Sequence, residues 1–247
     1  AADQVVDTPT DNHCTLNVLR PPNTNLTFTE GNLNAVSSSG FHTYQATFAL
    51  PVDGKWYWEV SAIGGSAPIG PGAGWDGMVG INRVGVGESL SPEAYNWGWG
   101  NAQTTASGKK YNDGQTDLVP ASSLTDNSIV MIAVDMPGGK IWWGVDGSWM
   151  GTDSGDNDGD PAAGSNPAFD NVNTDEPLFP GGGCENDPHR YNFGQLGFAH
   201  TPPTGFKGLS TANLDDPTIA DPSAYFQTTL YTGDGATTLA VNQGGNS

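Results

Sequence analysis

The sequence predicts an all-β protein, built as an antiparallel β-sandwich of two sheets. No segment has the apolar periodicity of a long amphipathic helix, whereas turn signals such as Asp53-Gly54 and Asp146-Gly147 recur at roughly ten-residue intervals. Short apolar stretches lie between these turns. Hydrophobic residues make up only 36% of the 247 residues, but aromatic residues reach 10%, so we expect rings to fill much of the core.

The stretch 55–62, KWYWEVSA, is the clearest single strand, because its side chains alternate between two faces. The apolar face carries Trp56, Trp58, Val60 and Ala62. The opposite face carries Lys55, Tyr57, Glu59 and Ser61. We therefore predict that the two tryptophans belong to the core rather than to a ligand platform. Tyr57 and Glu59 are expected on a polar, solvated face.

Four further stretches predict strands. Residues 129–134, IVMIAV, are apolar on both faces, which is typical of a central strand that is covered on both sides. Together with the Asp146-Gly147 turn they predict a three-stranded meander over 128–151, whose KIWWGV strand contributes Trp142 to the filling between the sheets. Residues 78–84 predict another strand. Residues 178–183 and 189–195 are expected to form a strand pair.

The chain is expected to divide into a sandwich over 1–209 and a C-terminal part over 210–247. Residues 211–223 are rich in Pro and Asp and predict a linker, and residues 224–241 predict one or two strands. This part is too short to form a core of its own. We expect it to pair with the sandwich, with a neighbouring subunit, or with a further module that it begins.

The net charge of −19, from 8 basic and 27 acidic residues, argues against several classes of partner. A surface this negative repels the phosphates of nucleic acids and of anionic lipids. No apolar run approaches the 18 or so residues of a membrane-spanning helix. The sequence therefore predicts neither nucleic-acid binding nor membrane association.

The two cysteines, Cys14 and Cys184, lie far apart in the sequence. A disulfide between them would close a very long loop, and two free thiols are equally compatible with the spacing. The same spacing does not suit a zinc site.

An acidic stretch, DSGDNDGDP, holds four aspartates within eight residues: Asp153, Asp156, Asp158 and Asp160. Calcium binds six to eight oxygens, often from alternate acids on a tight loop. The stretch departs from the EF-hand pattern, because Pro161 and Pro167 replace the required Gly and Glu. Two interpretations stay open, a calcium site and an exposed acidic loop.

Aromatic residues in predicted loops are the better candidates for ligand contacts. Trp75 and Asp76 lie in a Gly-rich insertion, and Tyr95, Asn96 and Trp97 lie in AYNWGWGN. A saccharide site combines a ring face with an Asp or Asn hydrogen-bonding group, and both stretches offer this combination. Alternatively, Trp97 and Trp99, two residues apart, are a core-facing pair on another strand.

No catalytic constellation emerges from the sequence. None of the six glutamates has a second acid at the spacing that a glycosidase strand would need. No Gly-x-Ser-x-Gly motif and no phosphate-binding glycine loop occurs, and the four histidines lie in no known motif. We therefore predict that the protein is not an enzyme.

Seven stretches follow one another along the chain: GKWYWEV, MVGINRVGV, YNWGWGN, GKKYNDG, SIVMIAVDMPGGKIWWGVDGSWMG, LFP and YNFGQLGFAHTPPTGFKGL. They occur in the order found in SPRY domains, and the chain resembles these domains over residues 14–209. The sequence is most similar to SPRY domains in structural proteins of marine bacteriophages. This resemblance implies a concanavalin-like sandwich that binds a partner through variable loops. Its matching motifs are framework and transfer no functional residue. The loops 64–77 and 151–171 depart from the family.

The resemblance leads to two expectations about function. The first is a virion surface or structural protein, of the capsid-decoration, fibre or adhesin type. It would assemble with its own copies or with other virion proteins through the C-terminal arm, and it would contact host glycans. The second is a secreted or cell-surface lectin that acts alone. Both place the protein on a virion surface or outside the cell.

Overall fold

The structure is a computed structural model, and it describes the chain in several stretches. These are residues 11–19, 25–62, 77–83, 96–101, 108–112, 115–118, 128–153, 155–184, 188–215 and 235. One compact unit comprises residues 1–213 and a second comprises residues 214–247. Ser210 belongs to the first unit, because it forms a β-bridge with His13. The next residue, Thr211, donates its N–H to the carbonyl of Asn12 at 2.9 Å.

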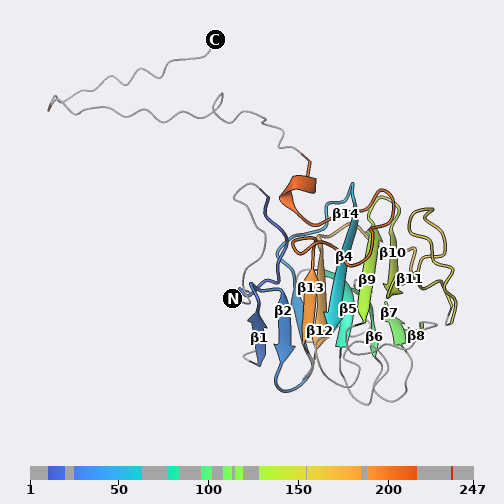
Figure 1. The fold of residues 1–247 in the computed structure, drawn as a ribbon, viewed down its shortest axis with the longest axis horizontal. Helices are drawn as coiled ribbons and strands as arrows, with labels where there is room; N and C mark the ends of the chain where they lie inside the picture. Colours follow the sequence, from blue (N-terminus) through green and yellow to red (C-terminus); the bar gives the residue numbers. More distant parts are fainter. Residues whose placement is uncertain are drawn as a thin grey trace, which may run out of the picture. The chain divides into compact units, whose positions relative to one another are not determined.

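One sheet has eight strands, and it lies in front in Figure 1. Seven of them follow the order β1-β2-β13-β4-β9-β10-β11, and the short β14 pairs with β4 in parallel. Their bounds are β1 Leu26–Thr29, β2 Asn34–Ser37, β13 His189–Asn192, β4 Lys55–Ala62, β9 Ile129–Asp135, β10 Lys140–Val145, β11 Ser148–Trp149 and β14 Lys207–Gly208.

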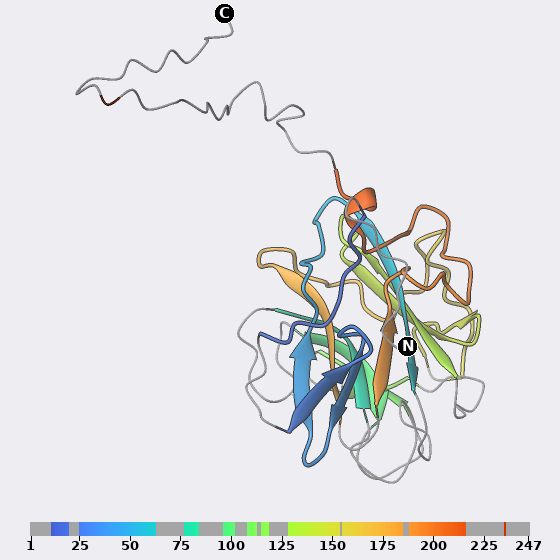
Figure 2. The same ribbon diagram turned by 60° about the vertical axis from the view of Figure 1, so that its left-hand side comes forward.

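The other sheet has six antiparallel strands in the order β3-β12-β5-β6-β7-β8. Their bounds are β3 His42–Gln45, β12 Leu178–Cys184, β5 Gly77–Arg83, β6 Asn96–Asn101, β7 Gly108–Tyr111 and β8 Gln115–Asp117. Figure 2 shows the two sheets as stacked layers. The predicted all-β sandwich is thus confirmed. A single turn of 3-10 helix, Thr211–Asn213, follows the last strand.

Large rings fill the space between the sheets. Trp58 on β4 and Trp143 on β10 both pair with Ile132 of the strand between them, so the three side chains form one row. All three are fully buried. The indole N–H of Trp143 donates to the carbonyl of Val79 on β5 at 3.1 Å, which ties the two sheets together. Trp56 is also buried, so both tryptophans of β4 belong to the core as predicted.

The predicted meander over 128–151 is confirmed as β9, β10 and β11. Asp146 and Gly147 have positive φ angles of 48° and 91°, as a tight two-residue hairpin turn requires. The Asp146 carboxylate also accepts hydrogen bonds from the hydroxyl of Ser128 and the N–H of Ile129, both at 2.8 Å. β9 lies between β4 and β10 and is buried from Val130 onward, as expected for a strand that is covered on both faces.

The predicted pairing of residues 178–183 with 189–195 is wrong. Both stretches contain strands, β12 and β13, but these lie in different sheets. β12 pairs with β3 and β5, whereas β13 pairs with β2 and β4. The chain therefore crosses between the two layers here. The two stretches were predicted to pair because they are close in the sequence. In the structure each of them pairs with other strands of its own sheet instead.

The strands predicted for residues 224–241 fall outside the described residues, apart from Gly235. Across the described stretches, no helix is long and apolar enough to cross a membrane.

Candidate functional site

The outer face of β4, which points away from the second sheet, carries Tyr57, Glu59 and Ser61. The sequence predicts that this face is solvated, and for the first two residues that prediction is wrong. Tyr57 is 0% exposed and Glu59 is 3% exposed. The reason is tertiary: residues 193–206, named here the covering loop, lie across this part of the sheet.

The strand order explains how the covering loop reaches that face. β13 ends at Asn192, which pairs with Glu59, and β14 begins at Lys207, which pairs with Trp56. The chain thus leaves the sheet beside β4 and rejoins it beside the same strand. Gly194 and Gly197, with φ angles of 114° and 72°, make the first turn of this excursion. Both angles favour glycine strongly.

Aromatic contacts hold the covering loop against the sheet. The ring of Phe198 meets the ring of Tyr57 edge-on, with centroids 4.8 Å apart, and the ring of Phe206 meets Trp142 at 6.3 Å. Tyr57, Trp142 and Phe206 form one apolar cluster with Met131 and Ala133. Trp142 is therefore buried as expected, but on the outer face rather than between the sheets.

Glu59 accepts four hydrogen bonds, and two of them fasten the covering loop to the sheet. Its Oε1 accepts from the hydroxyl of Tyr57 and from the backbone N–H of His200, both at 2.8 Å. Its Oε2 accepts from the N–H of Ala199 at 2.9 Å and from the amide of Asn192 at 3.4 Å. Burial raises the pKa of Tyr57, and the neighbouring carboxylate of Glu59 raises it further.

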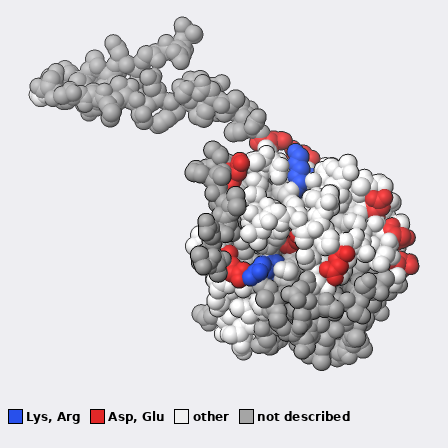
Figure 3. Space-filling view, viewed as in Figure 1, with Lys and Arg blue, Asp and Glu red and all other residues white. Residues whose placement is uncertain are grey.

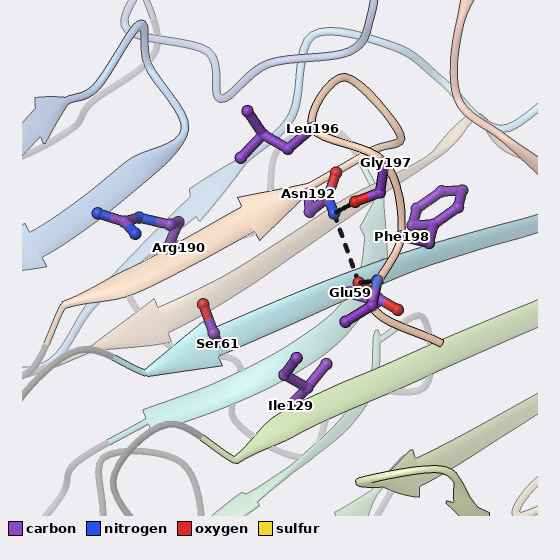
Figure 4. A pocket seen from close by; sticks show the side chains of 9 residues that line it. Glu59, Ser61, Ile129, Arg190, Asn192, Leu196, Gly197 and Phe198 are labelled. Atoms are coloured by element: carbon purple, nitrogen blue, oxygen red, sulfur yellow. Dashed lines mark hydrogen bonds between the residues drawn. The ribbon is translucent and has the colours of Figure 1, made fainter. Parts of the chain in front are cut away.

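A pocket of about 330 Å³ opens beside residues 196–199 of the covering loop. The next row of the outer face consists of Arg190, Ser61 and Ile129, which pair across β13, β4 and β9. Figure 4 shows these side chains in front of the sheet, with the covering loop above them. The lining residues are Glu59, Ser61, Ile129, Arg190, Asn192, Leu196, Gly197, Phe198 and Ala199.

Most polar groups of the pocket already have partners. Arg190 pairs with Glu30. The amide of Asn192 donates to the carbonyl of Gly197 at 2.8 Å, and its oxygen accepts from the N–H of Gly194 at 3.0 Å. Two groups among the described residues are exceptions: the hydroxyl of Ser61 has no hydrogen-bond partner, and the Nε of Arg190 is buried without one. The pocket therefore combines the hydroxyl of Ser61 with largely apolar walls.

The aromatic ligand candidates are only partly described. Trp75, Asp76 and Tyr95 lie outside the described residues, and Asn96 is described by its backbone alone, as the first residue of β6. Trp97 is 1% exposed, and its indole N–H donates to Asn171 Oδ1 at 3.1 Å. Its ring is therefore part of the core and offers no exposed face for stacking.

The four aspartates proposed for calcium do not converge on one point. No group of three or more His, Cys, Asp or Glu residues is placed to hold a metal ion in the described parts of the chain. Asp158 accepts instead from the amide of Asn166 at 3.0 Å, and Asp160 accepts from the N–H of Ala163 at 3.0 Å. Asp153 and Asp156 are exposed. In this structure the stretch is an exposed acidic loop, and the calcium site stays a prediction.

The two cysteines are free, buried thiols, so the disulfide considered from the sequence is not formed. The sulfur of Cys14 lies 3.7 Å from the hydroxyl of Thr47, and the thiol of Cys184 donates to the carbonyl of Ala35 at 3.8 Å. Burial raises the pKa of the Cys14 thiol to about 11. This thiol is therefore a poor nucleophile at neutral pH.

Most basic side chains within the described residues are engaged in local contacts. Lys55 and Arg83 pair with carboxylates, as does Arg190, whereas Lys110 and Lys140 donate to backbone carbonyls within residues 151–171. Figure 3 shows no continuous basic area among the described residues on the face that carries the pocket.

Comparison with known proteins identifies the fold. The SPRY domain of human HERC1 superposes with a TM-score of 0.50, covering 67% of this chain and 91% of that one at 17% identity. This chain has a SPRY-like β-sandwich fold. No family model matches the sequence. No curated protein matches it either. At this identity the likeness extends to the fold alone.

Proposed function

We propose that this SPRY-like chain is a non-enzymatic binding module on the surface of a virion, of the capsid-decoration, fibre or adhesin type. The observation that carries the binding role is the filling of the sandwich. The inner face of the eight-stranded sheet packs on the second sheet, and the covering loop buries much of its outer face. Recognition is thereby left to loops and to the pocket beside Ser61.

The non-enzymatic part of the proposal draws on the state of Glu59. It is the one carboxylate that lines the pocket within the described residues. Glycoside hydrolysis needs two carboxyl groups flanking the scissile bond. Both oxygens of Glu59 are also occupied, by Tyr57, Asn192 and two backbone N–H groups. Incubation with oligosaccharides tests this, and release of reducing sugar would contradict it.

The virion setting draws on the sequence. Residues 210–247 contain aromatic and apolar side chains, such as Tyr225 and Phe226, that can pack against another chain. In the proposed function these residues bind other copies of the chain or other virion proteins. The strongly acidic surface keeps the module from adhering to nucleic acid. Host glycans are its proposed external ligand.

Size-exclusion chromatography with light scattering tests the assembly. We expect the full chain to form multimers and the full-length double variant Tyr225→Ser, Phe226→Ser to be monomeric. Circular dichroism checks that the variant keeps its fold. A wild-type chain that stays monomeric at high concentration would remove the assembly proposal.

The alternative function is a solitary carbohydrate-binding lectin, secreted or on a cell surface. The pocket favours it, because a cavity of about 330 Å³ matches a small ligand rather than a subunit. A glycan array with the full chain distinguishes the two functions when it is read with the light scattering. A monomer that binds one sugar selects the lectin, and a multimer selects the virion protein.

A further inference from the structure

We propose that the pocket on the outer face of the eight-stranded sheet binds a neutral saccharide unit. This inference rests on the glycan contact in the proposed function and assigns that contact to a place. The sequence favours the segments around Trp75 and Tyr95 for ligand binding. The pocket is formed instead by the uncovered row Arg190–Ser61–Ile129 and by residues 196–199 of the covering loop.

The pocket is fixed by the fold rather than by a single loop. Three neighbouring strands supply its floor, and their register places Ser61 between Arg190 and Ile129. The wall at residues 196–199 is held in place because the N–H groups of Ala199 and His200 donate hydrogen bonds to the Glu59 carboxylate. A site whose walls are held in this way loses little entropy when a ligand binds.

The lining suits a ligand that is apolar on one side and carries hydroxyl groups on the other. Ile129, Leu196 and Phe198 give apolar surface, and Leu196 is 55% exposed at the rim. The guanidinium of Arg190 points away from Ser61 in Figure 4, so its aliphatic stem borders the pocket. The Ser61 hydroxyl can both donate and accept a hydrogen bond. Sugar rings present C–H faces and hydroxyl edges in the same way.

Charge favours a neutral ligand. Within the described part of the chain, two charged residues line the pocket, Glu59 and Arg190, and they have opposite signs. The net charge of −19 repels anionic sugars at long range. A cationic ligand would need a free carboxylate, and the oxygens of Glu59 already accept four hydrogen bonds.

Size favours a saccharide over a protein surface. Nine of the described residues line the pocket, whereas a stable protein interface needs about 20 to 30 residues from each partner. The volume of about 330 Å³ lies at the small end of ligand pockets, which start near 300 Å³.

The test begins with a glycan array of neutral, acidic and amino sugars and continues with titration calorimetry of the best binder. All measurements use the full chain. We expect a neutral glycan to bind, Ser61→Ala to weaken it about tenfold, which is the loss of one good hydrogen bond, and Ser61→Trp to abolish binding by filling the pocket.

Two further variants make the result specific. Thr27→Ala removes an exposed hydroxyl from β1 of the same sheet, outside the pocket, and we expect it to bind like the wild type. Trp75→Ala tests the segment that the sequence favours. Melting curves confirm that each variant is folded.

Different experimental results would contradict this inference and the proposed function. An array with no binder at all would remove the glycan contact itself. A glycan whose affinity is unchanged by both Ser61 variants but lost in Trp75→Ala would overturn the pocket assignment while the glycan contact stands. Preference for acidic or amino sugars at the pocket would overturn the neutral class.

Discussion

The two faces of β4 are both buried, but for different reasons. On the inner face, Trp58 is fully buried and lies in one row with Ile132 of the neighbouring strand. On the outer face, Tyr57 and Glu59 are buried only because the covering loop crosses them. Beyond the loop, Ser61 on the same face lines an open pocket. Burial on the inner face follows from the sheet, whereas burial on the outer face depends on one loop.

This difference gives each face its own role. The inner face supplies most of the stability, because its large rings are removed from water by the stacking of two sheets. The outer face is divided between a part that stabilises the loop and a part that is open to a ligand. The boundary lies at Glu59, which lines the pocket and also anchors the loop. Four experiments test this division.

The largest effect is expected on the inner face. Trp58→Ala should lower the free energy of unfolding by about 3–5 kcal/mol, because it leaves a cavity between the two sheets. Chemical denaturation followed by tryptophan fluorescence measures it. Trp58→Phe is the matched control and should cost less. A loss below about 1 kcal/mol for the alanine variant would mean that the row of Trp58, Ile132 and Trp143 is not closely packed.

The next effect concerns the anchor of the covering loop. Glu59→Ala removes four hydrogen bonds and should lower the free energy of unfolding by about 3 kcal/mol, since buried donors lose a charged acceptor. Glu59→Gln keeps one acceptor oxygen and should cost less. Limited proteolysis should cleave the alanine variant within residues 193–206 first. Equal resistance in wild type and variant would show that aromatic contacts alone hold the loop.

A third experiment compares tyrosines on the two faces by raising the pH. Burial raises the pKa of Tyr44 and Tyr191 on the inner side and of Tyr57 on the outer side. Because these pKa values are higher in the folded state, their contribution to stability is complete below the unfolded value near 10 and is lost as the pH rises above it. The loss should be roughly 1.4 kcal/mol per pH unit for each phenol.

Tyrosinate absorbance follows this titration. These three tyrosines should ionise only as the protein unfolds, and Tyr57→Phe should remove one of them from the unfolding step. If Tyr57 alone ionised near pH 10 in the folded protein, the covering loop would not exclude water from the outer face.

The smallest effect on stability is expected at Ser61, on the uncovered part of the outer face of β4. Ser61→Ala should change the free energy of unfolding by no more than about 0.5 kcal/mol, because the hydroxyl has no partner among the described residues and the side chain borders a pocket. Denaturation of the variant beside the wild type measures it. A loss above about 1 kcal/mol would show that Ser61 is part of the packed structure.

Local pattern was sufficient for several features of the fold. The alternation in KWYWEVSA correctly separated Trp56 and Trp58 from Tyr57 and Glu59, and the Asp146-Gly147 turn correctly predicted the meander. These features depend on residues close together in the sequence. The predicted pairing of β12 with β13 was wrong, because neighbouring strands in a sandwich can come from segments that are distant in the sequence.

The candidate site was beyond the reach of sequence patterns. Glu59 read as a solvated strand residue, and nothing near it in the sequence indicated that residues 199 and 200 would donate to it from 140 positions away. The available signal was the stretch GQLGFAHTPPTGF, which is apolar in places but has no strand alternation. Such a stretch can lie over a sheet, but its sequence does not say which sheet.

The sequence by itself determined which side chains share a face, where the tight turns fall, and the net charge of the chain. These properties follow from the two-residue period of a strand, from the backbone angles that Asp-Gly allows, and from summed charge. The tertiary structure alone decided that the outer face of β4 is covered at Glu59 and open at Ser61. Coverage is a contact between distant segments, and alternation along one strand carries no information about what packs against it.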